Sequence, residues 1–266
     1  MTTMATPLVA KTPGVWTQRL PLAVAVLVLF GWLLWSVSAR QALLLLVGVG
    51  LGWGLAAARF GFTTGWRHLI EQKDPSGVYG QIILLALLSA LSMPMLAHFP
   101  ETQAALGPPS ASLLVGAFVF GLCMQITDGC GSGTLYKAGL GVPLNMAILP
   151  VFALGSFMGT VHLNGWLSLG ALPPVGLVSQ WGAGGALAGT LVALSLVAIG
   201  VGRWSGTHLG VRSVPRRWVW GAVVLALFAA LNLFIAGQPW GVVYGFGLWG
   251  AKAMTALSLF DPTQNA

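Results

Sequence analysis

Apolar runs about twenty residues long recur along the whole 266-residue chain, and they constrain its fold more than any other feature. About 20 apolar residues form a helix that crosses the roughly 30 Å hydrocarbon core of a bilayer. Eight such segments can be delimited: 20–38, 42–58, 79–97, 112–127, 143–161, 183–201, 218–236 and 242–260. We therefore expect an all-α, polytopic membrane protein with about eight transmembrane or re-entrant helices.

The composition agrees with a membrane protein and excludes several other classes. Only 6% of the residues are charged, against about a quarter in soluble domains. The net charge of +7 follows membrane topology and does not indicate a nucleic-acid partner. Two cysteines are too few for a disulfide framework, so both are expected to be free. The four histidines show no metal-ligand spacing and no Walker motif is present, so we expect no metal, no other cofactor and no direct use of ATP.

The basic residues predict the orientation of the chain. Cytoplasmic loops of membrane proteins are enriched in lysine and arginine. If the N-terminus is cytoplasmic, Arg40 falls outside, Lys252 lies within a segment, and all other basic residues fall inside. These are Lys11, Arg19, Arg59, Arg67, Lys73, Lys137, Arg203, Arg212, Arg216 and Arg217. The pattern favours an even number of helices with both termini in the cytoplasm. If the loops at 59–67 and 128–139 are re-entrant, however, their charged residues line a pore and do not indicate the cytoplasmic face.

Residues 127–139, which we call the cysteine loop, interrupt two apolar segments with the sequence Thr-Asp-Gly-Cys-Gly-Ser-Gly-Thr-Leu-Tyr-Lys-Ala-Gly. A glycine-rich break at membrane depth must be buried in protein or line a wet cavity. Backbone N–H nests and helix N-termini bind anions, and a free thiol suits a sulfur-containing one. We expect an anion site formed by Gly129, Cys130, Gly131, Ser132, Gly133 and Thr134. The alternative is a glycine-lined helix crossing.

Charged residues near the cysteine loop have two interpretations each. Lys137 and Arg67 either attract the anion at a cytoplasmic vestibule or anchor the helices at the membrane surface. Asp128 either pairs with Lys137 or caps the helix that begins near Gly131. Cys123 lies in an apolar helix, where packing is the favoured interpretation.

The glycines also suggest packing and an internal repeat. Overlapping GxxxG patterns in Gly48–Gly54 predict close packing of a neighbouring helix. Gly245–Lys252 repeats the order of Gly61–Arg67: Gly-Phe, a spacer with Gly and Trp, then a cation. In a repeat, a second cysteine loop would follow about sixty-five residues later, which lies past Ala266. We therefore divide the chain into a tail (1–19), a first membrane half with the Cys130 loop (20–217) and the start of an incomplete or separately encoded second half (218–266).

Residues 128–139 resemble the motif Gly-Gly-Cys-x-[Ser/Thr]-Gly-Thr-x-Tyr-[Arg/Lys]-Ala-Gly of the YeeE/YedE family of bacterial inner-membrane sulfur transporters. Characterised members of that family take up thiosulfate. Arg59–Arg67 is similar to the family's earlier Arg-x-Gly/Arg-Phe-Cys loop, and Gln238–Lys252 resembles the opening of its second half. The resemblance implies an hourglass-shaped helical protein whose glycine-rich loops dip toward the centre of the inner membrane.

The resemblance also implies roles for individual residues. In the family, thiosulfate is thought to pass between successive cysteines through S–H···S hydrogen bonds. Cys130 corresponds to the central cysteine of that relay. Thr63, next to Thr64, stands where some members have the first cysteine. Asp128 replaces a frequent glycine, and an ionised carboxylate there repels a dianion, so the expected substrate is thiosulfate or a related small sulfur anion.

Two other functions stay open at this point. The chain could hand sulfur or selenium to a soluble sulfurtransferase through a persulfide on Cys130, which requires an accessible thiolate. It could also act only with a complementary membrane half. The expected partners are thus a small sulfur anion, the lipid bilayer, and either a soluble sulfur-carrier protein or that second half.

Overall fold

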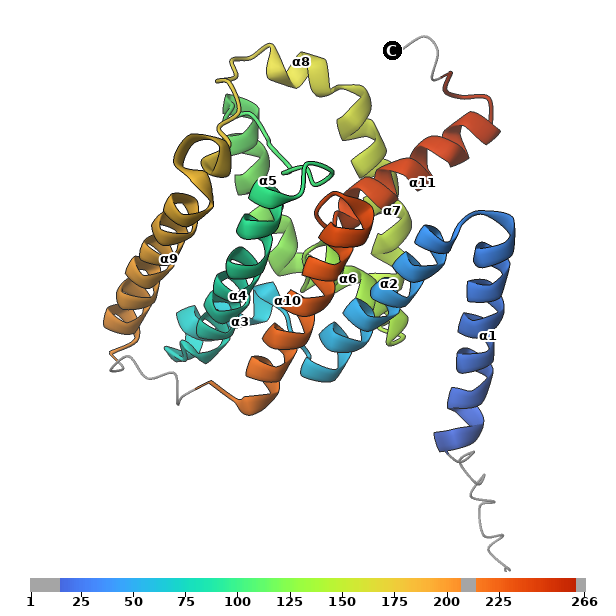
Figure 1. The fold of residues 1–266 in the computed structure, drawn as a ribbon, viewed down its shortest axis with the longest axis horizontal. Helices are drawn as coiled ribbons and strands as arrows, with labels where there is room; N and C mark the ends of the chain where they lie inside the picture. Colours follow the sequence, from blue (N-terminus) through green and yellow to red (C-terminus); the bar gives the residue numbers. More distant parts are fainter. Residues whose placement is uncertain (1–14, 207–213, 262–266) are drawn as a thin grey trace, which may run out of the picture. The chain divides into compact units, whose positions relative to one another are not determined.

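The computed structural model describes residues 15–206 and 214–261, and every regular element that it contains there is a helix (Figure 1). The helices are α1 (Val15–Ser36), α2 (Ala39–Ala58), α3 (Phe62–Gln72), α4 (Ser76–His98), α5 (Ala111–Thr127), α6 (Gly131–Gly139), α7 (Pro143–Val161), α8 (Leu163–Leu167), α9 (Leu177–Ser205), α10 (Arg216–Ala236) and α11 (Val242–Ala256). The all-α prediction is confirmed. Lys11 and Arg212 lie outside the described residues.

Six helical stretches in the described residues are long and apolar enough to cross a membrane, by length and composition. They are Ala39–Gln72, Ser76–His98, Ala111–Gly139, Pro143–Val161, Leu177–Ser205 and Arg216–Ala236. The protein is therefore a multi-pass membrane protein, but the expected count of eight is not confirmed. The apolar run 242–260 gives only the 15-residue α11, which rises about 22 Å and falls short of a roughly 30 Å core. α1 begins at Val15, within the stretch 1–19 that the sequence assigns to a tail.

The chain divides into two compact units, one up to Leu46 and one from Val47 onward. The first contains α1 and the first turns of α2. The second contains the rest of α2 and every later helix, including the cysteine loop. All contacts described below lie within this second unit.

Part of the predicted glycine pattern in α2 packs against α10. A Cβ at Gly54 would lie 3.1 Å from Val224, and one at Gly50 would overlap the ring of Phe228, whereas Gly48 has no neighbour within 4 Å. One of the two GxxxG patterns therefore faces the partner helix. The resulting core cluster consists of Val47, Leu51, Leu55, Ala58, Phe60, Ala222 and Leu225.

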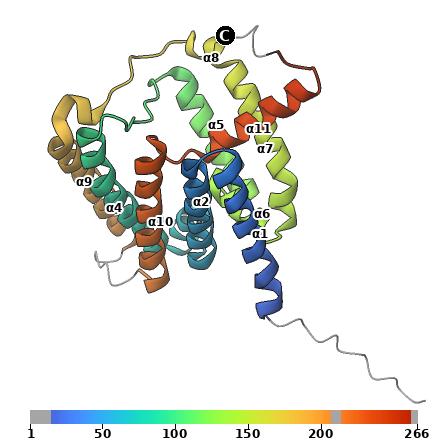
Figure 2. The same cartoon turned by 45° about the vertical axis from the view of Figure 1, so that its right-hand side comes forward.

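α4 lies between α9 and α10, and α3 crosses its first turn (Figures 1 and 2). The crossing of α3 and α4 depends on two glycines, because a Cβ at Gly77 would lie 2.5 Å from the Cα of Gly65. Gln81 of α4 is buried, and its Nε2 donates to the carbonyl oxygen of Phe62 at 2.9 Å. This bond satisfies a backbone carbonyl at the junction between α2 and α3.

A second group of helices consists of α6, α7 and α11, with α6 and α11 both packed on α7. The approach of α11 again depends on a glycine, since a Cβ at Gly250 would lie 2.7 Å from the carbonyl oxygen of Ala153. The rings of Phe152 and Phe246 meet edge to face, with centroids 5.2 Å apart. α7 occupies the residues predicted for it, 143–161.

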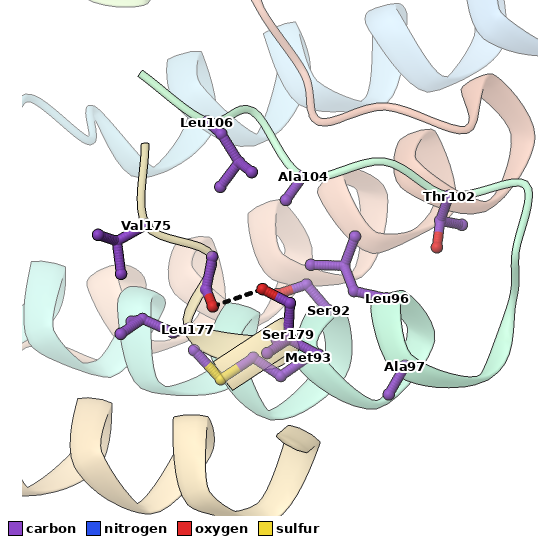
Figure 3. Close-up of a pocket in the computed structure, with 12 residues that line it drawn as sticks. Ser92, Met93, Leu96, Ala97, Thr102, Ala104, Leu106, Val175, Leu177 and Ser179 are labelled. Carbon is purple, nitrogen blue, oxygen red and sulfur yellow. Dashed lines mark hydrogen bonds between the residues drawn. The ribbon is translucent and has the colours of Figure 1, made fainter. Parts of the chain in front are cut away.

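The stretch between α7 and α9 contains the short helix α8, and α9 itself is kinked near its start. Gly182, with φ 67° and ψ 173°, separates the first residues of α9 from the long segment that follows. Beside this kinked end lies an open cavity of about 570 Å³ between α4 and α9 (Figure 3). Its lining includes Met93, Leu96 and Leu177, and the Oγ of Ser179 donates to the carbonyl oxygen of Gly176 at 2.8 Å. The lining residues include no charged side chain and no cysteine.

Candidate functional site: the cysteine loop

The cysteine loop breaks the helix for only three residues, between α5 and α6. Asp128 ends α5 in the left-handed conformation, with φ 51° and ψ 35°, and Cys130 has extended backbone immediately before α6. The hydroxyl of Thr127 donates to the carbonyl oxygen of Gly129 at 3.0 Å. A Cβ at Gly129 would lie 3.0 Å from the backbone nitrogen of Thr134, so the tight turn requires glycine there. The loop is thus a well-defined break in a membrane-spanning stretch.

Cys130 is the N-cap residue of α6 and is half-buried. Its Sγ lies 3.4 Å from the Oγ of Ser132, within hydrogen-bond distance for sulfur. The first helical hydrogen bond of α6 runs from the N–H of Thr134 to the carbonyl of Cys130, at 2.8 Å. The N–H groups of Gly131 and Gly133 precede that bond and have no helical acceptor. A helix N-terminus with free N–H groups favours an anion, and here the thiol stands beside it.

A cavity of about 200 Å³, which we call the cysteine cavity, contains Cys130 and Ser132 in its wall. Its other lining residues come mainly from α2, α4 and α10: Leu51, Leu55, Phe60, Phe62, Gln81, Leu84, Leu85, Leu88, Leu225, Ala229 and Trp240. The start of α10 carries Arg216 and Arg217. The cavity residues of α4, from Gln81 to Leu88, lead away from that end. Trp240, which also lines the cavity, follows the opposite end of α10. The cavity therefore extends from the cysteine loop toward the end of the bundle opposite the arginines.

Three charged residues, which we call the ion-pair cluster, lie on the cysteine loop and α3. The Nζ of Lys137 lies 2.6 Å from Asp128 Oδ2, and the guanidinium of Arg67 lies 3.5 Å from Asp128 Oδ1. Lys137 also donates to the backbone carbonyl of Asp128, and Arg67 donates to that of Gln125 at 2.9 Å. The predicted pairing of Asp128 with Lys137 is confirmed. The alternative that Asp128 caps α6 is wrong, because Cys130 occupies the cap position without a side-chain cap bond.

Only some of the other residues predicted for the site lie near the thiol of Cys130. A Cβ at Gly133 would lie 3.7 Å from Cys130 Sγ, whereas Gly131 faces the ring of Phe152. Thr134 is buried under Gly129 and does not line the cysteine cavity. Of the predicted set, only Cys130 and Ser132 line that cavity.

The α3 threonines and the second cysteine have separate environments. Thr63 is buried, and its hydroxyl has no hydrogen-bond partner among the described residues. A Cβ at Gly61 would lie 3.0 Å from the hydroxyl oxygen of Thr64. Neither threonine lines the cysteine cavity, although the adjacent Phe62 does. Cys123 is exposed on α5, so packing within the described part of the chain does not account for it, and both cysteines are free.

Two polar residues at the site were not predicted. Gln81 lines the cysteine cavity, and the buried Asn145 donates through Nδ2 to the carbonyl oxygen of Thr127 at 3.1 Å. Both lie in apolar, membrane-spanning helices. Polar side chains at membrane depth usually face the protein interior and mark functional paths, and that signal could have identified them.

Comparison with known proteins places the chain in a family. The chain is similar to the thiosulfate transporter TsuA of Spirochaeta thermophila, with 28% identity over 222 residues that cover 77% of this chain and 66% of the relative. It is also similar to the thiosulfate transporter TsuA of Escherichia coli, with 29% identity over 128 residues, or 46% of this chain and 35% of the relative. The chain thus spans just under two thirds of the length of the first relative and about a third of the second. The profile of the family described as "Sulphur transport" matches residues 57–266, and since this is most of the chain, the protein belongs to that family, as its resemblance to the YeeE/YedE transporters predicts.

Proposed function

We propose that this protein carries thiosulfate, or a closely related small sulfur anion, across the bacterial inner membrane, and that Cys130 lies on the path. The observation that carries the proposal is the position of Cys130. Its thiol stands in the wall of the cysteine cavity and at the free N-terminus of α6. The two relatives named as thiosulfate transporters support the choice of substrate.

The apolar cavity suits an anion that carries a large, polarizable sulfur. The walls are mostly aliphatic and aromatic, so water-like hydrogen bonding is available only at a few points. They include the thiol of Cys130 and the hydroxyl of Ser132, whereas the Nε2 of Gln81 already donates to the carbonyl oxygens of Gly61 and Phe62. A thiol donates a weak hydrogen bond to a sulfur or oxygen atom and releases it easily. Binding that is weak and sequential allows the substrate to leave as well as enter.

The proposed orientation puts the N-terminus and the basic loops in the cytoplasm. Lys73, at the end of α3, lies 4.2 Å above the ring of Trp204 near the end of α9. Val214, just before α10, packs in one cluster with Leu69 of α3. The end of α3, the end of α9 and the start of α10 therefore lie on one side of the second unit (Figure 1, lower end), and they carry Lys73, Arg203, Arg216 and Arg217. The positive-inside rule assigns that side to the cytoplasm, and the cysteine cavity then extends toward the outside.

Sulfur hand-off to a soluble carrier is less well supported by this geometry. A docking protein needs direct access to a thiolate. Cys130 is half-buried beside a cavity of about 200 Å³ between membrane-spanning helices. A small anion fits such a space, whereas a carrier protein does not.

Uptake of radiolabelled thiosulfate tests the proposal directly. Bacterial cells without their own thiosulfate import would express the wild-type chain, Cys130→Ala, or the matched control Cys123→Ala. We expect uptake by the wild type and the control, and its loss in Cys130→Ala at equal protein levels in the membrane. Equal uptake by all three would remove Cys130 from the path. A persulfide on Cys130 without uptake would favour the hand-off function.

A further inference from the structure

We propose that Arg67 and Lys137 form a second anion-binding station next to Cys130, and that the carboxylate of Asp128 occupies it until the transported oxyanion displaces it. The inference rests on the proposed function and adds a role for Asp128 as a tethered competitor of the substrate. The ligand class is a small divalent oxyanion such as thiosulfate.

The ion-pair cluster already binds a carboxylate in the way that it would bind an oxyanion. Asp128 presents one oxygen to Lys137 at 2.6 Å and the other to Arg67 at 3.5 Å. Charge-assisted hydrogen bonds of this kind are the usual means of holding sulfate-like and carboxylate groups. Two cations and one carboxylate leave an excess of one positive charge, whereas two cations and a divalent oxyanion balance.

The two cations stay in place without the carboxylate because each has a second anchor on the backbone. Arg67 donates to the carbonyl oxygen of Gln125 at 2.9 Å, and Lys137 donates to the backbone carbonyl of Asp128. Lys137 is largely buried, with 15% of its side chain exposed, whereas the side chain of Asp128 is 45% exposed. The carboxylate of Asp128 is therefore the least enclosed member of the cluster and the one that can move away from the other two.

Exchange of the two anions explains how a site with two cations avoids trapping a dianion. Asp128 and Cys130 are two residues apart in the chain, which keeps their Cα atoms within about 7 Å of each other, so the thiol and the cluster are neighbours. When the anion replaces the carboxylate, Asp128 becomes an unpaired negative charge beside it. The returning carboxylate then competes for the same two cations and favours release.

A purely structural role for Asp128 and a role as competitor predict opposite changes in anion affinity when the carboxylate is removed. If the ion pairs only hold the α5–α6 turn together, removing the carboxylate loosens the site and weakens anion binding. If Asp128 competes with the substrate, its removal tightens binding. The sign of the change in affinity therefore separates the two roles.

The test uses the full chain in lipid nanodiscs and proteoliposomes, with radiolabelled thiosulfate as the probe. The central variant is Asp128→Asn, because asparagine tolerates the left-handed conformation of this position. We expect it to bind thiosulfate about tenfold more tightly and to transport it more slowly, since a competitor of about the strength of a charged hydrogen bond is gone. Lys137→Gln should weaken binding about tenfold by the same reasoning. Glu101→Gln, which removes an exposed carboxylate from another loop, controls for net charge.

A second variant tests competition without relying on the first. Asp128→Gly retains the left-handed backbone at this position. In this variant, added acetate should compete with thiosulfate for Arg67 and Lys137, as the Asp128 carboxylate does in the wild type. Acetate should compete far less with the wild type, whose station is already occupied. Unchanged or weaker thiosulfate binding in Asp128→Asn, or no effect of acetate on Asp128→Gly, would overturn the second station while leaving Cys130-dependent uptake intact. Absence of saturable thiosulfate binding and uptake in the wild type would instead overturn the proposed function and the station with it.

Discussion

The side-chain amide of Asn145, in the first turn of α7, donates to the backbone carbonyl oxygen of Thr127, the last residue of α5, at 3.1 Å. Asn145 is 1% exposed, so the bond lies in the interior. It connects the helix after the cysteine loop to the helix before it. The position of Cys130 therefore depends on a residue that has no contact with substrate in the proposed path.

Replacing Asn145 with leucine should loosen the cysteine loop. The carbonyl of Thr127 would lose a buried donor, which costs about 1–3 kcal/mol. Thermal unfolding in detergent should show a lower midpoint, and Cys130 should react faster with a thiol reagent. Thr160→Val is the control, because Thr160 bonds within its own helix and its side chain is exposed. Equal stability and equal reactivity of Asn145→Leu and the wild type would refute the positioning role.

Filling the cysteine cavity should block access to Cys130. Ala229 lines the cavity, and a tryptophan at that position adds more volume than the space of about 200 Å³ accepts beside a substrate. In a Cys123→Ser background, Ala229→Trp should slow labelling of Cys130 by a charged thiol reagent added from outside, and should reduce thiosulfate uptake. Leu227→Trp is the matched control on the same helix, since Leu227 is exposed and lies outside the cavity. Unchanged labelling in Ala229→Trp would show that access does not run through this cavity.

The crossing of α3 and α4 should not tolerate a single added methyl group. A Cβ at Gly77 would lie 2.5 Å from the Cα of Gly65, and backbone cannot rotate away as a side chain can. Gly77→Ala should therefore lower the free energy of unfolding by about 1–3 kcal/mol. Gly80→Ala adds a methyl group at ordinary contact distance, 3.4 Å from Trp218, and should be neutral or slightly stabilising. Chemical unfolding in mixed micelles measures both, and a Gly77→Ala variant as stable as Gly80→Ala would contradict the close approach.

The packing of α11 on α7 should show the same contrast. A Cβ at Gly250 would lie 2.7 Å from the carbonyl oxygen of Ala153 and 2.7 Å from the Cβ of Phe157. Gly250→Ala should move α11 outward and expose α7, costing about 1–3 kcal/mol, whereas Gly245→Ala meets no atom within 4 Å. Limited proteolysis after α10 reports the loosening. Identical cleavage of the two variants would argue against a tight α7–α11 contact.

The helical, membrane-spanning character and the position of the helix break both follow from local patterns of residues. Apolar periodicity over about 20 residues is a local property, and it placed α7 at 143–161 without error. The glycines of the cysteine loop also act locally, since Gly129 is required by contacts to Thr134 only five residues away. The pairing of Asp128 with Lys137 spans a single short helix and was equally accessible to sequence reasoning.

Which distant residues meet at that break depends on how the helices pack against one another, and no local pattern predicts this. Arg67 of α3 reaches the carbonyl of Gln125 of α5 across 58 residues, and this contact depends on how the two helices are placed in the folded chain. The cysteine cavity exists because α2, α4 and α10 leave a space beside Cys130, and no local pattern encodes a space between helices. The expected count of eight membrane segments is not confirmed, because an apolar run shows only where a helix is compatible with lipid. Where that helix ends, as α11 does at Ala256, depends on the packing and capping of the folded chain.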